Sequence, residues 1–253
     1  MKKEKVVVIC GPTASGKTAL SIELAKKING EIVSCDSMQI YKEMDIGTAK
    51  TTKEEMQGIK HYMLDIISPE ERYSVADYKK EAKNAIREIL KKGKTPIVVG
   101  GTGLYVDSLI YEIEYPNIEF DEEYRKKLEI QVEKEGLENL YEQAKKIDPE
   151  AIKKISQNDK KRIIRILEIY HATGYNKTEQ ERKSREKEPE FDYKVYGLNM
   201  PREKLYKRID LRVDIMIKQG LIEEVEKIYK KYSKFPTAMQ GLGYKEVVEY
   251  LNG

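Results

Sequence analysis

The feature that most restricts the fold of this chain is the run GPTASGKT at 11–18, which fits the pattern G-x-x-x-x-G-K-[ST]. It stands between a continuous apolar run, KVVVIC at 5–10, and a helical pattern over 17–28. A strand, a glycine-rich turn and a helix in this order direct backbone N–H groups and a helix amino terminus at an anion. Lys17 would add a charge at the terminal phosphates, and the Thr18 hydroxyl would reach a Mg²⁺ ion. The predicted phosphate-binding residues are Gly11, Pro12, Thr13, Ala14, Ser15, Gly16, Lys17 and Thr18.

The first third of the chain alternates strand and helix patterns. Further strands are predicted over 31–36 and 96–103, and a helix over 74–93 begins with Ser74 as N-cap and Asp77 three residues later. In the helix over 17–28, Leu20, Leu24 and Ile28 are expected to form the buried stripe. This alternation is typical of a parallel sheet covered by helices.

The pattern changes near Pro116. Helices are predicted over 121–135, 137–147 and 158–173, before an apolar β-type run resumes at 192–200. Pro201 then opens a long helix. Its expected buried stripe is Leu205, Ile209, Val213, Met216 and Ile217. We therefore expect an α/β fold, a P-loop NTPase-like parallel sheet flanked by helices over 1–116 and 190–253, with an all-helical insertion at 117–189.

Composition narrows the possible compartments and partners. No apolar run approaches the roughly 20 residues of a membrane span. The chain has two cysteines and no export signal, so we expect a cytoplasmic protein whose cysteines are packing residues. The net charge is only +3, but residues 153–187 carry 11 basic and five acidic residues. Such a segment is either a solvated helical face or a surface for a polyanion.

Two further residues should face the phosphate site. Asp36 follows the second strand and Thr102 the third, and the carboxyl ends of parallel strands border the ligand crevice. The third strand ends in glycine, whereas a nucleotide hydrolase needs an acidic metal ligand. Asp36 could bind Mg²⁺ through water, act as a general base or cap a helix. These residues alone do not exclude a small-molecule kinase.

Together with the phosphate loop, six other runs resemble landmarks of the tRNA dimethylallyltransferases (tRNA isopentenyltransferases), in the same order along the chain. They are DSMQIYKEMDIGTAK (36–50), YSVADY (73–78), VGGTGLY (99–105), NDKKRIIRILEIY (158–170), RIDLRVDIMIKQGLIEEVE (208–226) and AMQGLGYKE (238–246). Members of that family usually continue past the point matching Gly253 with a basic, aromatic segment that helps to hold RNA.

The resemblance implies a reaction. Dimethylallyl diphosphate would occupy the phosphate loop, and N6 of an adenosine in the anticodon loop of tRNA would attack the allylic carbon and release diphosphate. Asp36 would accept or orient the N6 proton, and Gln39 would read the adenine edge. The implied catalytic residues are Asp36, Thr102 and Arg208, with Arg212 as a further diphosphate ligand and Mg²⁺, held by Thr18, as cofactor. The implied tRNA-binding residues are Asp36, Ser37, Met38, Gln39, Thr102, Lys161, Arg162, Ile163, Ile164 and Arg165.

The target adenosine must leave its stack to react, and Tyr41, Tyr73 and Tyr105 are candidates to stack on it. We expect a monomer with no membrane partner. The alternatives are a P-loop small-molecule kinase, a prenyltransferase acting on free adenine nucleotides, and a nucleotide-regulated RNA-binding protein without chemistry.

Overall fold

The computed structural model describes residues 3–115, 121–185 and 187–253. The chain forms two compact units. The core unit comprises Met1–Ile110 and Pro189–Gly253, and the helical unit comprises Tyr111–Glu188. Most of the segment predicted as an insertion lies in the helical unit.

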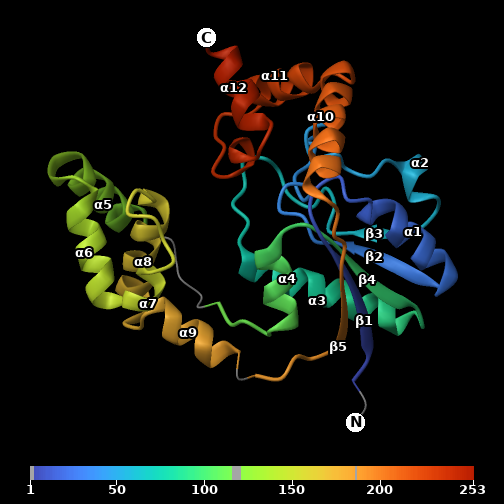
Figure 1. The fold of residues 1–253 in the computed structure, drawn as a ribbon, viewed down its shortest axis with the longest axis horizontal. Coiled ribbons are helices and arrows are strands. Elements are labelled where there is room, and N and C mark those ends of the chain that lie inside the picture. Colours follow the sequence, from blue (N-terminus) through green and yellow to red (C-terminus); the bar gives the residue numbers. More distant parts are fainter. Residues whose placement is uncertain (1–2, 116–120, 186) are drawn as a thin grey trace. The chain divides into compact units, whose positions relative to one another are not determined.

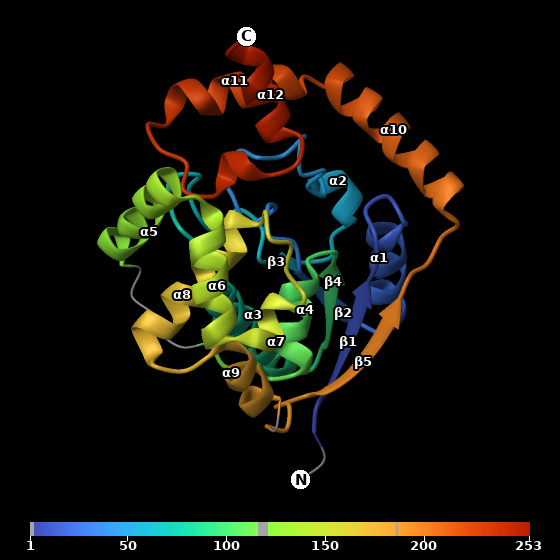
Figure 2. The same ribbon diagram turned by 60° about the vertical axis from the view of Figure 1, so that its left-hand side comes forward.

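The core unit is built on a parallel sheet of five strands in the order β3-β2-β4-β1-β5. The late strand β5 pairs with β1, so the sheet resumes after the helical unit, and Figure 2 shows the two strands side by side. The strands are β1 (Lys5–Cys10), β2 (Gly30–Ser34), β3 (His61–Tyr62), β4 (Thr95–Gly100) and β5 (Asp192–Gly197).

Seven helices of the core unit accompany this sheet in the described part of the chain (Figure 1). They are α1 (Lys17–Lys27), α2 (Lys53–Met56), α3 (Val75–Lys91), α4 (Gly103–Ile110), α10 (Arg202–Lys218), α11 (Leu221–Lys231) and α12 (Tyr244–Leu251), with a 3₁₀ turn at Ala238–Gln240. The predicted start of α3 is confirmed: Ser74 and Asp77 form a reciprocal capping box. The short elements α2 and β3 and the helix α4 were not predicted.

The inner strands β1, β2 and β4 are largely apolar because both faces of this part of the sheet are covered. On one face, Ile32 and Ile97 pack against α1, in a cluster that includes Ile22 and Ala25. On the other face, Val8, Val33 and Val98 pack against α3 and α4; this cluster includes Tyr78, Ile86, Tyr105 and Leu109. The alternation fixes the register of each strand, since a shift by one residue would exchange the two sets.

The predicted buried stripe of α1 is wrong at Leu20, whose side chain is 41% exposed. The buried residues of this helix are Ser21, Ile22 and Ala25. Small residues at Ser21 and Ala25 let the helix lie close to the sheet, and Leu20 is turned away from it.

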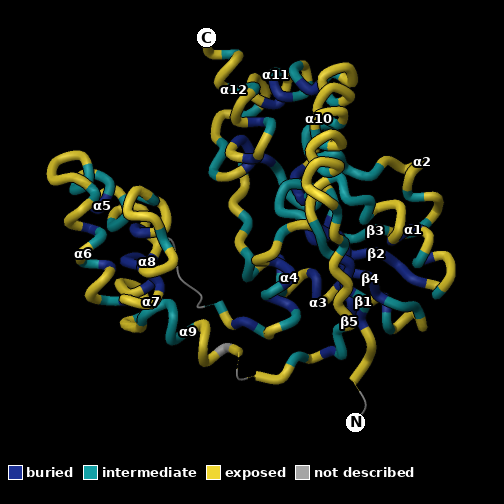
Figure 3. Tube along the Cα trace, in the orientation of Figure 1, coloured by how far each residue is buried: buried dark blue, intermediate teal, exposed yellow. Residues whose placement is uncertain are grey.

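The stripe predicted for α10 is also wrong, because this helix contains no buried residue. Figure 3 shows it as exposed or intermediate along its length. Ile209, Val213 and Met216 line a cavity, so the apolar side of α10 borders open space where a packed core was expected.

A third cluster joins α11 and α12 to the loop that follows β2. Ile40, Tyr41 and Met44 of that loop are buried against Leu221, Val225, Ile228 and Tyr244, among others. The carboxyl-terminal helices therefore support a loop from the first quarter of the chain.

The helical unit contains α5 (Glu122–Glu135), α6 (Leu137–Ile147), α7 (Pro149–Ile152), α8 (Lys160–Thr173) and α9 (Lys177–Ser184). Leu128, Leu140, Ala144 and four residues of α8 form its core. The spacing of Ile163, Ile164, Leu167 and Tyr170 predicts a buried stripe on α8, and this is wrong at Tyr170, which is 44% exposed. The buried positions of α8 are Ile163, Ile164, Ile166, Leu167, Glu168 and Ile169.

Neither cysteine in the described part of the chain forms a disulfide. Cys35 is fully buried and Cys10 is half-buried. None of the described helices has both the length and the apolar character of a membrane span.

Candidate functional site

The phosphate loop links β1 to α1. Gly16 occupies the N-cap position of α1 with φ 94°, and Ala14 also has a positive φ, 61°, so the backbone folds tightly around the loop centre. Lys17 crosses this loop and donates from Nζ to the carbonyl oxygens of Gly11 (2.9 Å) and Pro12 (2.7 Å). The Ser15 Oγ is buried and has no hydrogen-bond partner among the described residues. A buried hydroxyl without a partner suits a ligand that brings acceptor oxygens.

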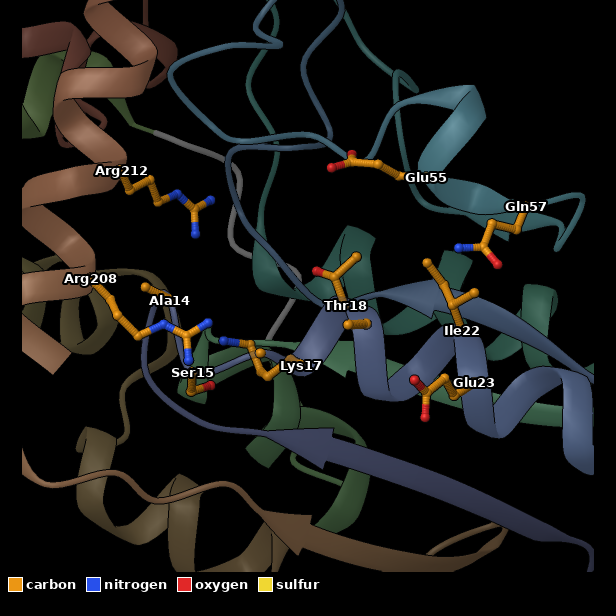
Figure 4. Close-up of a pocket in the computed structure, with 12 residues that line it drawn as sticks. Ala14, Ser15, Lys17, Thr18, Ile22, Glu23, Glu55, Gln57, Arg208 and Arg212 are labelled. Carbon is orange, nitrogen blue, oxygen red and sulfur yellow. The ribbon is translucent and has the colours of Figure 1, made fainter. Parts of the chain in front are cut away.

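Two arginines reach the same loop from α10. Arg208 and Arg212 lie one helical turn apart, and Figure 4 shows both side chains extending towards the loop. With Ser15, Lys17 and Thr18 they line a cavity of about 390 Å³. Glu55 of α2, Gln57 directly after that helix and Glu23 of α1 also line it. The structure thus brings together the loop and both predicted arginines.

The cations at this cavity are partly removed from water. Burial lowers the pKa of the Lys17 ammonium, and Arg212 lowers it further, while Asp36 acts in the opposite direction. Burial also lowers the pKa of the Arg212 guanidinium, opposed by Asp36 and Glu55. A nearby negative charge therefore stabilises the protonated form of each side chain, and a bound diphosphate would supply that charge.

Asp36 closes the turn that follows β2. Its Oδ1 accepts hydrogen bonds from the backbone N–H groups of Met38 (2.9 Å) and Gln39 (3.3 Å). The residues that follow form turns rather than a helix, so the alternative in which Asp36 caps a helix is wrong. Asp36 lines a second cavity, which shares Lys17, Thr18 and Arg212 with the first.

Thr102 holds this turn from the neighbouring strand. Its Oγ1 accepts a hydrogen bond from the backbone N–H of Ser37 at 3.0 Å, and its own N–H donates to Cys35 O at 3.2 Å. Gly100 allows this close approach, since a Cβ there would lie 2.0 Å from Cys35 O. The glycine that ends β4 therefore permits two predicted site residues to meet.

The side-chain amide of Gln39 is hydrogen-bonded at both ends. Its Oε1 accepts from Ser34 Oγ at 3.1 Å, and its Nε2 donates to the carbonyl oxygens of Thr48 (3.2 Å) and Ala49 (3.3 Å). Both ends of the amide are thus engaged within the protein, and reading an adenine edge would require these contacts to be exchanged. Met38, like Gln39, lines the second cavity.

The second cavity, about 310 Å³, changes character along its length. Thr13, Lys17, Thr18 and Asp36 form a polar end, whereas Ile209, Val213, Met216, Leu221 and Leu242 supply an apolar wall. Gly47, Thr48 and Ala49 line it as well. An elongated ligand with an anionic head and a short hydrocarbon group matches this arrangement.

Two of the three predicted stacking tyrosines are buried. Tyr41 is 1% exposed and belongs to the carboxyl-terminal cluster, while Tyr105 stacks on Tyr78 with ring centroids 4.0 Å apart. Tyr73 packs against the core and donates from its hydroxyl to Glu81. The stacking prediction is therefore wrong for Tyr41 and Tyr105, and for the half-buried Tyr73 it stays a prediction.

The basic residues predicted to bind tRNA lie at the start of α8 in the helical unit. Lys161, Arg162 and Arg165 are exposed. Arg165 pairs with the buried Glu168, and Arg162 pairs with Asp159. Ile163 and Ile164 are 0% and 1% exposed and belong to the core of the unit, so their side chains support the helix that carries the basic residues.

Several residues that line the two cavities were not predicted from the sequence. Glu55 lies in α2 and Gln57 directly follows that helix. Its Thr52–Glu55 capping box is visible in the sequence as T-x-x-E. Gly47, Thr48 and Ala49 belong to the GTAK run, which marked the family without any assigned role. In the described part of the chain, no group of three His, Cys, Asp or Glu side chains is arranged to hold a metal ion.

The family comparison decides what kind of protein has this site. The IPP transferase family model matches residues 39–253. This chain belongs to the IPP transferase family. A tRNA dimethylallyltransferase of Caldanaerobacter subterraneus subsp. tengcongensis is 52% identical over 252 residues, which cover 98% of this chain and 80% of that protein.

Solved structures of relatives agree with this assignment. The tRNA isopentenylpyrophosphate transferase of Bacillus halodurans is 45% identical, with a TM-score of 0.70 and coverage of 99% of this chain and 78% of that one. A eukaryotic dimethylallyltransferase acting on tRNA is 35% identical, with a TM-score of 0.78 and coverage of 98% and 63%. The predicted family, the P-loop-like α/β fold and the enzyme class are confirmed.

Proposed function

We propose that the chain transfers the dimethylallyl group of dimethylallyl diphosphate to N6 of an adenosine next to the anticodon of tRNA. A C–N bond forms at the allylic carbon, the C–O bond to diphosphate breaks, and N6 loses one proton. The main support for this proposal is that Lys17, Thr18 and Arg212 line both cavities. The first cavity, with its basic side chains, therefore adjoins the second cavity, which is lined by Asp36 and by apolar residues.

The cationic cavity is suited to the diphosphate. Lys17, Arg208 and Arg212 supply three positive charges against the two carboxylates of Glu23 and Glu55. The Ser15 hydroxyl supplies a donor that has no partner among the residues that the structure describes. Negative charge grows on the diphosphate as the C–O bond breaks. Fixed cations and donors in a partly desolvated pocket stabilise that charge more in the transition state than in the ground state.

The second cavity is suited to the transfer itself. Ile209, Val213 and Met216 offer an apolar surface to the five-carbon group, and Asp36 lies in the lining of the same cavity as Lys17 and Thr18. The Asp36 Oδ1 is used by the turn, but neither oxygen is paired with a cation at salt-bridge distance in the described structure. A carboxylate so placed is a proton acceptor for an attacking amine whose nitrogen is barely basic.

A divalent cation fits the phosphate loop. Mg²⁺ is commonly bound by one or two protein ligands together with phosphate oxygens and water, so a full protein cage is not needed. Thr18, at the start of α1 and in the lining of both cavities, would hold it with the bound diphosphate. When bound, Mg²⁺ would neutralise charge on the leaving group.

We further propose that the exposed basic start of α8 binds tRNA phosphates. Lys161, Arg162 and Arg165 project from a helix whose opposite side is packed into the core of the helical unit. A rigid helix with several exposed cations is suited to a phosphate backbone. The enzyme would act as a monomer in the cytoplasm, on tRNA that has not yet been modified.

One assay tests the activity. The purified protein is incubated with labelled dimethylallyl diphosphate, Mg²⁺ and unmodified tRNA, and label is measured in the RNA after nuclease digestion and nucleoside separation. We expect label only in an N6-substituted adenosine. A parallel reaction with γ-labelled ATP tests the kinase alternative, and a third with AMP tests prenylation of free nucleotides. Label in phosphorylated product, or in AMP but not in tRNA, would contradict the proposal.

A further inference from the structure

The loop at 45–47 is held by a carboxylate from the far end of the chain. Glu224 of α11 accepts hydrogen bonds from the backbone N–H groups of Asp45 (3.0 Å) and Ile46 (2.8 Å) at Oε2, and of Gly47 (3.2 Å) at Oε1. Three successive N–H groups on one carboxylate form an anion-binding turn. Hydrogen bonds to a charged acceptor are stronger than neutral ones, so this contact restrains the loop tightly.

A tyrosine completes the clamp. The Tyr244 hydroxyl donates to Glu224 Oε1 at 2.5 Å, and its ring lies against Gly47, where an added Cβ would be 2.5 Å from the ring. Tyr244 is fully buried. Burial and the neighbouring Glu224 carboxylate both raise the pKa of the phenol, so it stays a donor at neutral pH.

The clamped loop continues into the wall of the second cavity. Gly47, Thr48 and Ala49 line that cavity, whereas Glu224 does not. The carbonyl oxygens of Thr48 and Ala49 in turn accept both N–H bonds of the Gln39 amide. A continuous chain of contacts therefore runs from Glu224 through the loop to Gln39, which lines the same cavity.

The opposite side of the loop is fixed separately. Lys50, whose side chain is 6% exposed, donates from Nζ to Tyr41 O and to the carboxylates of Asp45 and Asp65. The loop is thus attached at both ends, and Glu224 holds residues 45–47, next to the part that faces the cavity.

We infer that Glu224 is a positioning residue for the acceptor side of the site, holding the Gly47–Ala49 wall and the Gln39 amide where the adenine must enter. This inference rests on the proposed function. Glu224 touches neither the phosphate loop nor its arginines among the contacts described above, so diphosphate binding should not depend on it.

The test compares Glu224→Gln with Glu226→Gln. Glu226 is on the same helix and pairs with Lys230 at the surface, so it undergoes the same chemical change away from the loop. In Glu224→Gln the amide NH₂ would face backbone N–H groups, and the loop should move. Because a misplacement of about 1 Å can reduce catalysis about 100-fold, kcat/KM for tRNA should fall by about that factor, with a raised KM for tRNA. The Kd for inorganic pyrophosphate, measured by calorimetry, should be unchanged.

A purely structural role gives a different result. Partial unfolding lowers kcat and the calorimetric stoichiometry together and leaves the KM for tRNA at its wild-type value. Glu224→Asp, which keeps the carboxylate, should recover part of the lost kcat/KM. If Glu224→Gln does not fold, Tyr244→Phe removes one donor to Glu224 and keeps the ring on Gly47, and it should raise the KM for tRNA by about two- to fivefold.

The inference is overturned if the KM for tRNA in these variants equals that of wild type, or if their affinity for pyrophosphate falls in parallel. Failure of the proposed function looks different, because wild type itself would then leave no label in tRNA.

Discussion

The Thr102 hydroxyl oxygen accepts a hydrogen bond from the backbone N–H of Ser37 at 3.0 Å, and this contact ties the turn after β4 to the turn after β2. Asp36 stands beside Ser37, and its carboxylate closes the same turn through Met38 N–H. The placement of the proposed base therefore depends on a neutral side chain from another strand.

Replacing Thr102 by valine should misplace Asp36 without disturbing the fold. Valine has the same shape but offers no acceptor to Ser37 N–H, so kcat should fall by about 10- to 100-fold while pyrophosphate binds normally. Steady-state kinetics and calorimetry test this. Thr95→Val is the matched control, because Thr95 starts the same strand and donates to Ile28 O. An equal loss in both variants would contradict the prediction.

Asp36→Asn separates proton transfer from positioning. Asparagine keeps the Oδ1 that the Met38 and Gln39 N–H groups use, so the turn should persist. It cannot take a proton at neutral pH, and kcat and kcat/KM should fall together by about 10²- to 10⁴-fold. Steady-state kinetics are run at two Mg²⁺ concentrations beside a thermal melt. Partial rescue by Mg²⁺ would assign Asp36 to the metal, and a near-wild-type kcat would remove it from the proposed mechanism.

Lys17→Ala tests the phosphate loop directly. The variant loses the Nζ contacts to the Gly11 and Pro12 carbonyls and the charge expected on diphosphate. A hydrogen bond to a charged group contributes about 1.5–3 kcal/mol, which corresponds to a Kd for pyrophosphate raised by about 10- to 100-fold. Calorimetry measures this change. Lys26→Ala, in the last turn of the same helix, should bind like wild type.

Arg212 should contribute more to diphosphate binding than Arg208. Arg212 is half-buried and lines both cavities, whereas Arg208 is exposed and lines one. Charges that are less screened by solvent interact more strongly, so Arg212→Ala should raise the Kd for pyrophosphate more than Arg208→Ala does. Lys207→Ala, one residue from Arg208, serves as control. The reverse order of the two arginines would contradict the assignment.

The double variant Lys161→Ala with Arg165→Ala tests the tRNA surface of α8. If both side chains contact phosphates, the slope of log K against log salt should become shallower by about 1.5 to 2. Filter binding of tRNA over a salt series gives this slope. Lys126→Ala with Lys127→Ala removes the same charge from the exposed face of α5. Equal slopes in the two double variants would mean that the salt dependence of tRNA binding reflects only the net charge of the protein.

Local signals in the sequence predicted much of this molecule. The capping box of α3 and the phosphate loop depend on contacts within a few residues, so their residue types alone identify them. The parallel sheet followed from apolar runs that must be covered on both faces, as Val33 and Ile32 are. The arginine pair on α10 followed from helical spacing.

Other features depend on contacts between distant segments. The apolar spacing of α10 predicts a buried stripe, yet that side of the helix borders a cavity. The capacity of the Gln39 amide to read a base was predicted from its chemistry, but Thr48 and Ala49 already engage its donors. No local sequence pattern near Glu224 or near residues 45–47 predicts the contact between them.

The pairing of β5 with β1 has a consequence for how the chain folds during synthesis. Val8 pairs with Val195, and every residue of the helical unit must leave the ribosome before that pair can form. Until then one edge of β1 offers unpaired backbone groups, a state that favours association with other chains. The helical unit, whose contacts are local in sequence, can fold in that interval. The order of synthesis thus makes closure of the sheet edge a late step, and the time for which nascent β1 stays open grows with the length of the inserted segment.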